Sequence, residues 1–316
     1  MKGKENTVEQ FYVAQAPSLG LGLMAGAQGL KRPILEPTVN RPGLALAGFT
    51  KYFASKRIQA IGSAEVTYLK TLTAKVRTQR YEALCEHPVP CFVFSRNLKP
   101  DRDFLRIAER ANIPVFRCPL ITMQFISRAT LALEDTFAPR TTVHGSMVDI
   151  LGIGVIIKGE SGIGKSECVL SLLERGYSLV ADDVTRLRLL DGREVMGTSA
   201  DITRNHMEVR GIGIIDVAAM FGVKSIRTEK RVDLVVTLRE WDKVGHIDRI
   251  GLEEEKVDLL GIDITHVTIP VRPGRDLASL VEAAALNTKL RQAGFNAAAE
   301  LNRRLLERME GQKAGQ

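Results

Sequence analysis

A glycine-rich loop constrains the fold of this chain more than any other feature of its sequence. Val155 to Ile157 before the loop predict a buried strand, and Glu167 to Arg175 after it predict a helix. A strand, a tight loop and a helix in this order are typical of α/β folds with parallel strands, so we expect such a fold here. The loop fits the spacing GxxxxGK[ST] and consists of Gly159, Glu160, Ser161, Gly162, Ile163, Gly164, Lys165 and Ser166.

The residue types in this loop predict a nucleotide site. Its glycines let the backbone turn so that successive N–H groups and a helix N-terminus converge on phosphate oxygens. We expect Lys165 to pair with the β- and γ-phosphates of ATP and the Ser166 hydroxyl to bind Mg²⁺. A merely structural glycine turn is the competing interpretation, and the flanking strand and helix patterns disfavour it. The loop does not define the acceptor, because ATPases, GTPases and kinases all use it.

Two adjacent carboxylates follow the next apolar run. Tyr177 to Ala181 predict a buried strand that ends in Asp182 and Asp183. The carboxyl end of a strand is where doubly wound sheets hold ligands. Neighbouring side chains of a strand point in opposite directions, so we expect one carboxylate to reach the substrate and the other to serve a metal or the structure. An isolated Asp-Asp pair would more often be a solvated turn, but its position after the loop helix favours a site.

Other charged residues are weaker candidates. Glu208 and Arg210 are two positions apart, so they share a face if the chain is extended there, and Glu208 could complete a magnesium shell; a surface ion pair is the plainer interpretation. Arg249 and the segment Pro270, Val271, Arg272, Pro273, Gly274 and Arg275 supply arginines in turns, which suit a phosphate clamp but are usually only solvated. His144 by itself is more often structural than catalytic.

The first half of the chain alternates strand and helix patterns without a catalytic motif. Cys91 to Phe94 and Ile113 to Phe116 predict strands, and Asp101 to Ala111 predict the helix between them. A helix over Phe125 to Phe137 should end at Ala138-Pro139-Arg140. We therefore expect a small α/β scaffold or assembly domain over residues 1–134 and a catalytic domain over residues 135–316, whose last part, Leu277 to Met309, predicts two helices interrupted near Gly294.

Composition narrows the class of protein. With 316 residues, of which 45% are hydrophobic and 26% charged, two globular domains are expected. The net charge of +7 favours acidic or phosphorylated partners, but the basic residues are dispersed among 37 acidic ones, so we expect no nucleic-acid partner. The four cysteines lack the spacing of a zinc site or a disulfide framework. No apolar run approaches the roughly 18 residues of a membrane span, so a cytoplasmic protein without a membrane partner is expected.

These motifs together resemble the bacterial HPr kinase/phosphorylase family, whose members act on a serine of the phosphocarrier protein HPr. The resemblance extends over nearly the whole chain. In the second half it is carried by residues 141–145, 159–167, 179–183, 207–211 and 270–275, and in the first half by residues 40–44, 57–59 and 134–140.

The resemblance implies a role for each matching residue. Asp183 would be the acid/base residue that takes the proton of the serine hydroxyl, and His144, Lys165 and Arg249 match other catalytic positions. Ser166 and Glu208 match magnesium ligands, with Asp182 and Arg210 in support. Pro270 to Arg275 match a segment tied to the reverse reaction, in which inorganic phosphate attacks phosphoserine and pyrophosphate is released.

Family membership further implies a homohexamer, a MurF-like N-terminal domain and a C-terminal P-loop kinase domain that resembles the core of phosphoenolpyruvate carboxykinase. The partner would be HPr or a variant of it. Asp276, where many relatives have Asn, and His246, where Tyr is commoner, depart from the family pattern and bear on the balance of the two activities.

Two other functions fit parts of the sequence. A kinase of a small hydroxyl metabolite could use the same core, but it would not need the N-terminal half. A nucleotide-dependent DNA-binding regulator is supported only by the basic isoelectric point, since the chain shows no clear helix-turn-helix pattern.

Overall fold

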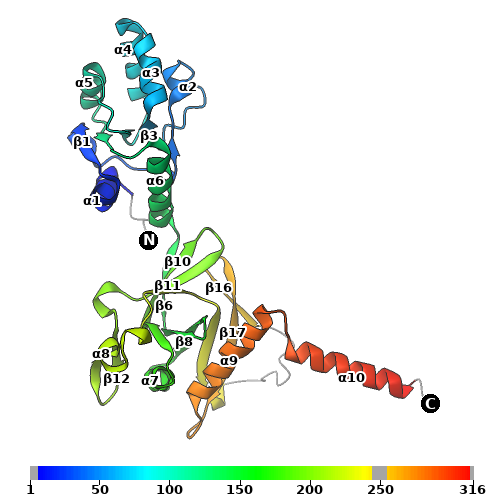
Figure 1. Ribbon diagram of the computed structural model, residues 1–316. Helices are drawn as coiled ribbons and strands as arrows, with labels where there is room; N and C mark the ends of the chain where they lie inside the picture. The colour runs from blue at the N-terminus through cyan, green and yellow to red at the C-terminus, as the bar shows by residue number, and fades with distance from the viewer. Residues whose placement is uncertain (1–5, 244–254, 314–316) are drawn as a thin grey trace. The chain divides into compact units, whose positions relative to one another are not determined.

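The computed structural model describes residues 6–243 and 255–313 (Figure 1). By its contacts the chain divides into two compact units, residues 1–138 and 139–316. Each unit has its own sheets and its own hydrophobic clusters.

Unit 1 is built on one five-stranded sheet in the order β1-β5-β4-β3-β2. Strands β2 to β5 are parallel, and β1 joins the edge antiparallel to β5. The strands are β1 (Gly22–Ala25), β2 (Val39–Asn40), β3 (Ile58–Ile61), β4 (Phe92–Phe94) and β5 (Val115–Arg117). The α-helices are α1 (Val8–Leu19), α2 (Gly43–Leu46), α3 (Ser63–Thr71), α4 (Ala74–Cys85), α5 (Arg102–Arg110) and α6 (Thr122–Phe137).

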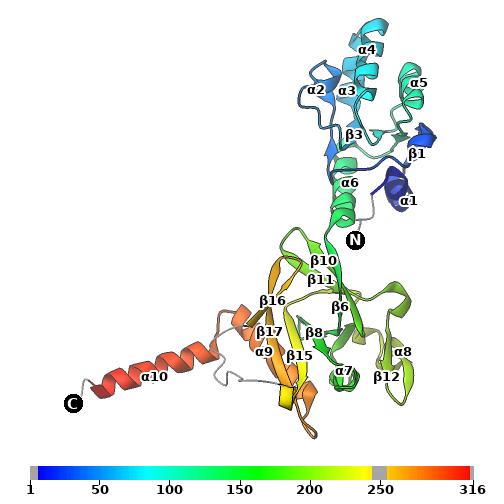
Figure 2. The same ribbon diagram turned by 180° about the vertical axis from the view of Figure 1, so that it is seen from behind.

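Successive side chains along the strands of unit 1 pack alternately into two hydrophobic clusters. Cys91 and Val93 pack with residues of α1 and α6, whereas Phe92 and Phe94 pack with Phe104 of α5 and residues of α2 to α4. Because successive side chains of a strand point to opposite faces, a continuous apolar run of this kind belongs to a sheet covered on both sides. Helices therefore cover both faces of this sheet, as the two opposite views show (Figures 1 and 2).

The local predictions for unit 1 are confirmed within one to three residues at most ends. The strands predicted at Cys91 to Phe94 and Ile113 to Phe116 are β4 and β5, and the predicted helices are α5 and α6. The side chain of Asp101 accepts a hydrogen bond from the N–H of Asp103, which explains the start of α5. The helix α6 ends at Phe137, before Pro139, as a proline requires.

Unit 2 contains a six-stranded sheet, a four-stranded sheet and a two-stranded hairpin. Its strands are β6 (Arg140–His144), β7 (Ser146–Ile150), β8 (Ile153–Gly159), β9 (Ser178–Ala181), β10 (Val184–Leu190), β11 (Glu194–Thr198), β12 (His206–Val209), β13 (Gly213–Asp216), β14 (Glu229–Arg231), β15 (Leu234–Glu240), β16 (Glu255–Leu259) and β17 (Ile262–Val271). Its α-helices are α7 (Lys165–Glu174), α8 (Val217–Phe221), α9 (Leu277–Gln292) and α10 (Ala297–Lys313).

The six-stranded sheet has the order β16-β17-β15-β8-β7-β9. Strands β8, β15 and β17 are parallel, and β7 lies antiparallel between β8 and β9. Two antiparallel steps give β9 the same direction as β8, so both strands end at one edge of the sheet. The glycine-rich loop and the Asp pair, which follow β8 and β9, are therefore brought to the same edge.

The six-stranded sheet separates two cores. Val155 and Ile157 of β8 pack with residues of α7 and α9 and of the hairpin β12–β13. Ile156, between them, packs on the opposite face with Leu187 and Val195 of the four-stranded sheet. The helices α7 and α9 thus lie on one face of the six-stranded sheet, and a second sheet covers the other.

The C-terminal prediction is also confirmed. The helix α9 ends at Gln292, Gly294 has a φ of 90°, and α10 begins at Ala297. Glycine adopts this left-handed conformation at little cost, which allows the break between the two helices. None of the helices in residues 6–243 and 255–313 has the length and apolar character that crossing a membrane requires.

Candidate active site

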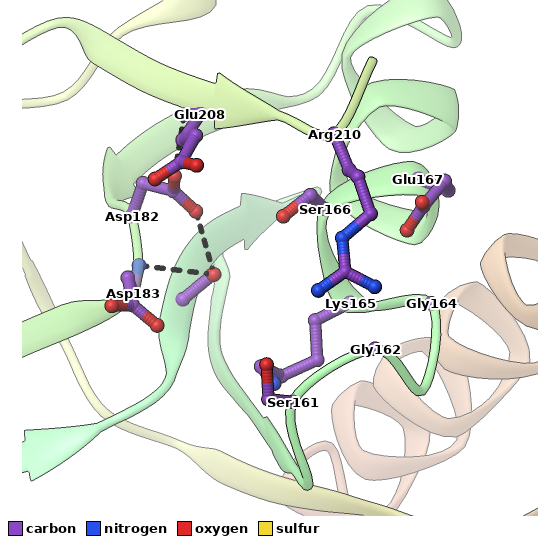
Figure 3. Close-up of a pocket in the computed structure, with 11 residues that line it drawn as sticks. Ser161, Gly162, Gly164, Lys165, Ser166, Glu167, Asp182, Asp183, Glu208 and Arg210 are labelled. Atoms are coloured by element: carbon purple, nitrogen blue, oxygen red, sulfur yellow. Dashed lines mark hydrogen bonds between the residues drawn. The ribbon is translucent and has the colours of Figure 1, made fainter. Parts of the chain in front are cut away.

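A polar pocket of about 200 Å³ opens at the edge of the six-stranded sheet where β8 and β9 end (Figure 3). Its walls come from four separate parts of unit 2: the start of β7, the glycine-rich loop with the first turn of α7, the Asp pair, and the end of β12. The lining residues are Ser146, Ser161, Gly162, Gly164, Lys165, Ser166, Glu167, Asp182, Asp183, Glu208 and Arg210.

The glycine-rich loop joins β8 to α7 in the shape that an anion site needs. Gly162 and Gly164 have φ values of 83° and 101°, which residues with a side chain rarely adopt. Gly164 directly precedes the first residue of α7, so the unpaired N–H groups of the helix start open toward the pocket. The Lys165 ammonium donates to the carbonyl oxygens of Gly159 and Glu160 at 2.8 and 2.9 Å, which holds it beside the loop.

Asp182 is a partly buried, hydrogen-bonded carboxylate. Its Oδ1 accepts from the Ser146 hydroxyl at 2.8 Å, and its Oδ2 accepts from the backbone N–H of Glu208 at 3.0 Å. Burial raises the pKa of this carboxyl above its ordinary value, and the hydrogen bonds from Glu208 and Ser146 oppose that rise. Asp182 therefore ties the hairpin β12–β13 and the start of β7 to the end of β9.

Asp183 has a different environment although it is the next residue. Its φ of 55° places it in the left-handed region, between the end of β9 and the start of β10. Its N–H donates to the Ser146 hydroxyl oxygen at 3.3 Å, and its carbonyl accepts from Gly145 at 2.7 Å. Its carboxylate is exposed toward the pocket and has no hydrogen-bond partner among the described residues. The two carboxylates have different environments, and a left-handed turn at Asp183 produces the difference instead of simple strand alternation.

Glu208 and Arg210 reach the pocket from a hairpin that lies far along the chain. Both side chains project from the end of β12 toward the loop and the Asp pair (Figure 3). The Arg210 guanidinium lies so close to the loop that a Cβ added to Gly162 would be 3.3 Å from it. On the other face of the hairpin, Met207 and Val209 are buried against the core, which fixes the orientation of the exposed face.

The charges of the pocket fit a magnesium-nucleotide complex. Four carboxylates line it, those of Glu167, Asp182, Asp183 and Glu208, against the two cations of Lys165 and Arg210. A polyphosphate would be repelled by such a set unless a divalent cation came with it. The Ser166 hydroxyl and the Glu208 carboxylate offer hard oxygen ligands of the type that Mg²⁺ prefers.

Other predicted site residues lie away from this pocket. His144 is exposed at the end of β6, where it is the pairing partner of Val184 and lies two residues before Ser146; it is not among the pocket residues. Gly159 and Glu160 line a neighbouring pocket of about 560 Å³ beside β15, and Ile163 packs against the core. Arg249, like His246, falls outside the described residues.

The segment Pro270 to Arg275 comprises the last two residues of β17 and the start of the turn that leads to α9. Inside the turn, the backbone N–H of Arg275 donates to the carbonyl of Arg272 at 3.2 Å, and Nη1 of Arg275 donates to the carbonyl of Pro270 at 3.1 Å. The Arg272 guanidinium lies 3.3 Å from the ring centre of Trp241, the single tryptophan of the chain. This contact follows from the register of the parallel strands β15 and β17. Glu240 of β15 pairs with Val271 of β17, so the residues that follow them, Trp241 and Arg272, lie side by side.

Asp276, the departure from the family pattern just after this turn, has a structural role. Its side chain caps α9 by accepting from the N–H of Ser279, and it pairs with Arg175 at 2.7 Å. The hydrogen bonds from Ser279 and the pairing with Arg175 lower the pKa of Asp276 to about 2. Asn is also a favourable N-cap, so this position can hold either residue without losing the cap.

Two residues of this region were missed by the sequence reasoning. Ser146, which is only 1% exposed, donates to the Asp182 carboxylate and accepts from the backbone N–H of Asp183, so it links the Asp182 side chain to the backbone of Asp183. It directly follows residues 141–145, which match the family pattern, and this position could have indicated it in the sequence. Trp241 had no signal, because its contact depends on the register of two strands.

Both halves of the chain match models of known protein families. The family model described as "HPr Serine kinase N terminus" matches residues 7–133, and the one described as "HPr Serine kinase C-terminal domain" matches residues 135–305. The chain belongs to the HPr serine kinase family. Both family models together account for nearly all of the described residues.

Curated relatives are similar over the full length. The HPr kinase/phosphorylase of Bacillus mycoides is 41% identical over 306 residues, which are 97% of this chain and 96% of that protein. The HPr kinase/phosphorylase of a Geobacillus species is 42% identical over 290 residues, 92% and 93% of the two chains. A solved structure titled as the Hpr(Ser) kinase/phosphatase from Coxiella burnetii matches with 32% identity and a TM-score of 0.47, covering 51% of this chain and 98% of that one.

Proposed function

We propose that this protein transfers the γ-phosphoryl group of ATP to a serine of HPr, and that it also removes the group by phosphorolysis. The observation that carries the proposal is the position of Asp183, an exposed carboxylate without a hydrogen-bond partner among the described residues, in the same pocket as the glycine-rich loop. Family membership and the names of relatives that match 97% of the chain support the choice of HPr as the acceptor.

In the forward direction Asp183 accepts the proton of the serine hydroxyl while the serine oxygen attacks the γ-phosphorus. The bond from the γ-phosphorus to the bridging oxygen of ADP breaks, and phosphoserine and ADP are formed. A positioned general base contributes about 10²- to 10⁴-fold, so the rest of the acceleration must come from charge stabilisation and positioning. Lys165 and Arg210 are the described cations close enough to the loop to stabilise the transferring group.

In the reverse direction inorganic phosphate attacks the phosphoserine phosphorus, and the bond from that phosphorus to the serine oxygen breaks. Asp183, now protonated, returns its proton to the serine oxygen, and pyrophosphate leaves. The same cations stabilise a loose transition state whichever oxygen attacks, so one site can serve both directions. We propose that Arg272 and Arg275 act in this direction, and that His144 and Arg249 complete the site.

The residues present fit the cofactor that the reaction implies. Ser166 and Glu208 would hold Mg²⁺ next to the loop, and Asp182 would support it through its bond to the backbone of Glu208. When bound there, the ion would supply positive charge that offsets the negative charge of the phosphate groups.

Three further features belong to the proposal. We propose a catalytic domain over residues 135–316 with a phosphoenolpyruvate carboxykinase-like core, and a MurF-like scaffold or assembly domain over residues 1–134. We propose a homohexamer that works in the cytoplasm with HPr as its partner and without nucleic acid or membrane. A kinase of a small hydroxyl metabolite is the alternative, and the match of residues 7–133 to the N-terminal family model disfavours it.

The test is phosphoryl transfer from radiolabelled ATP to purified HPr with Mg²⁺, followed by excess inorganic phosphate. We expect HPr to become labelled and then to lose the label as labelled pyrophosphate. If HPr stays unlabelled while ATP is consumed, the acceptor is wrong and small hydroxyl compounds become the candidates. Arg272→Ala and Arg275→Ala should slow the second step more than the first, and equal losses would remove their separate role.

A further inference from the structure

The hairpin β12–β13 carries two isoleucines on its exposed side that the fold does not use. Ile212 is 70% exposed and Ile214 is 76% exposed. The hairpin already contributes Met207, Val209 and Ile215 to the core from its other face. Its exposed isoleucines therefore add nothing to the packing of unit 2.

The register of the hairpin places one of these isoleucines beside the candidate site. Ile214 is the direct antiparallel partner of Glu208. Side chains of directly paired residues lie on the same face, with Cβ atoms about 4.5–5.5 Å apart. Ile214 is thus on the face of the hairpin from which Glu208 reaches the pocket (Figure 3).

Ile212 extends this apolar surface to the tip of the hairpin. It stands between Gly211 and Gly213, whose φ values of 89° and 103° make the turn. Hairpin tips usually carry polar residues, which hydrogen-bond their own backbone or water. An isoleucine exposed there, next to a second one on the adjoining strand, is the kind of apolar patch that marks an interaction site.

We propose that Ile212 and Ile214 form a docking surface for HPr, on which apolar side chains next to the acceptor serine pack while the serine enters the pocket. The proposal rests on the proposed function and names the surface that its protein substrate uses. A serine that reaches Asp183 brings its own chain over the rim of the pocket, and this hairpin forms that rim at Glu208 and Arg210.

The position of Ile212 and Ile214 also favours a partner that binds reversibly. A second copy of this chain seated permanently on Ile214 would cover the residue paired with Glu208 and obstruct the mouth of the pocket. A substrate must leave after each turnover, so a reversible partner fits an exposed patch at this place. In protein interfaces a few central residues supply most of the binding free energy.

The test compares Ile214→Thr and the double variant Ile212→Thr/Ile214→Thr with wild type in both directions. Threonine keeps the β-branched shape, so the hairpin should still form. We expect KM for HPr and for phosphoserine-HPr to rise roughly tenfold or more in the double variant, with kcat and KM for ATP within twofold of wild type. Val13→Thr is the matched control, because Val13 of α1 is 72% exposed and lies in unit 1; it should leave both KM values unchanged.

Three results would overturn the proposal. The first is an unchanged KM for HPr in the double variant. The second is a fall in kcat or in ATP affinity equal to the rise in KM, because this would show a damaged pocket. The third is a loss of oligomeric mass by light scattering at unchanged KM, which would assign the patch to a second copy. If wild type itself fails to label HPr, the proposed function fails instead, so the two failures are distinguishable.

Discussion

The two units of the molecule treat the same kind of sheet edge in opposite ways. In unit 1 the carboxyl edge is closed by its own side chains. The N–H of Gly62 after β3 donates to Glu65 at 2.9 Å, and the Ser95 hydroxyl after β4 lies 2.8 Å from that of Thr122. Glu65, Ser95 and Thr122 are all buried, so these polar groups are satisfied within unit 1.

In unit 2 the corresponding edge is open. Asp182 is satisfied by two hydrogen bonds, but the carboxylates of Asp183 and Glu208 and the guanidinium of Arg210 face a pocket without hydrogen-bond partners in the described residues. Charged groups that gather at one sheet edge without protein partners are typical of a site where a ligand completes them. The carboxyl edge of a sheet is therefore a candidate binding site only where charged side chains remain without protein partners. The position at the strand ends is not sufficient by itself.

The largest expected effect is that of Lys165→Ala. Loss of the cation beside the loop should lower kcat in both directions by about 10³-fold or more, because the charge on the transferring group is no longer stabilised. Arg117→Ala, at the carboxyl end of β5 in unit 1, is the matched control and should leave both rates unchanged. The measurement is kcat with HPr at saturating ATP for both variants. A comparable loss of kcat in Lys165→Ala and Arg117→Ala would contradict the contrast between the open edge of unit 2 and the closed edge of unit 1.

Asp183→Asn should follow, with a loss of about 10²- to 10⁴-fold in transfer to HPr. Asparagine tolerates the left-handed backbone that Asp183 adopts, so the melting temperature should stay near that of wild type. Activity is measured as label transferred to HPr, and stability by thermal unfolding. A folded variant with near-normal transfer would remove Asp183 from its role.

Glu65→Ala sharpens the comparison from the side of unit 1. The substitution leaves the N–H of Gly62 and the Arg41 guanidinium without their carboxylate, so we expect a loss of about 1–3 kcal/mol in unfolding free energy. Urea denaturation measures the loss, and kcat at low temperature should stay within twofold of wild type. A large fall in kcat without a change in unfolding free energy would mean that this edge of unit 1 takes part in the reaction.

Trp241→Ala tests the turn that follows β17. Removal of the ring frees the Arg272 guanidinium, and a cation–π contact of this kind corresponds to about a fivefold effect. We expect phosphorolysis to fall by roughly that factor and phosphorylation of HPr to fall less. Trp241→Phe keeps a ring and should restore most of the loss. Equal losses in both directions, unrelieved by Phe, would count against a positioning role.

Asp182→Asn should have the smallest effect, on the order of 1 kcal/mol, and a characteristic pH dependence. Because burial raises the pKa of Asp182 in the folded protein, its contribution to stability is fully present below the ordinary carboxyl value of 3.8 and is lost as pH rises through the folded pKa. The unfolding free energy of wild type minus that of the variant should therefore decrease as pH rises above 3.8. Urea titrations from acidic to neutral pH check the sign, and a flat difference would contradict it.

The sequence predicted the local elements of the site because each depends on neighbouring residues. The apolar run before Gly159, the glycines of the loop and the run that ends in Asp182 were enough to predict β8, α7 and β9. Their meeting at one edge of the sheet, with the antiparallel β7 between β8 and β9, became evident only in the structure. Hydrophobic periodicity defines an element, but it carries no information on which strand pairs with which.

The sequence by itself therefore determined the chemical groups of the candidate site: a glycine-rich loop with the spacing typical of phosphate binding, and two carboxylates after a strand. Its motifs also match one family over nearly the whole chain. What only the tertiary structure decided is which distant residues share the pocket. Ser146 links the Asp182 carboxylate to the backbone of Asp183. The hairpin brings in Glu208 and Arg210, and the parallel register stacks Trp241 on Arg272. These contacts depend on strand register and on turns with left-handed residues, which arise only when the whole sheet packs.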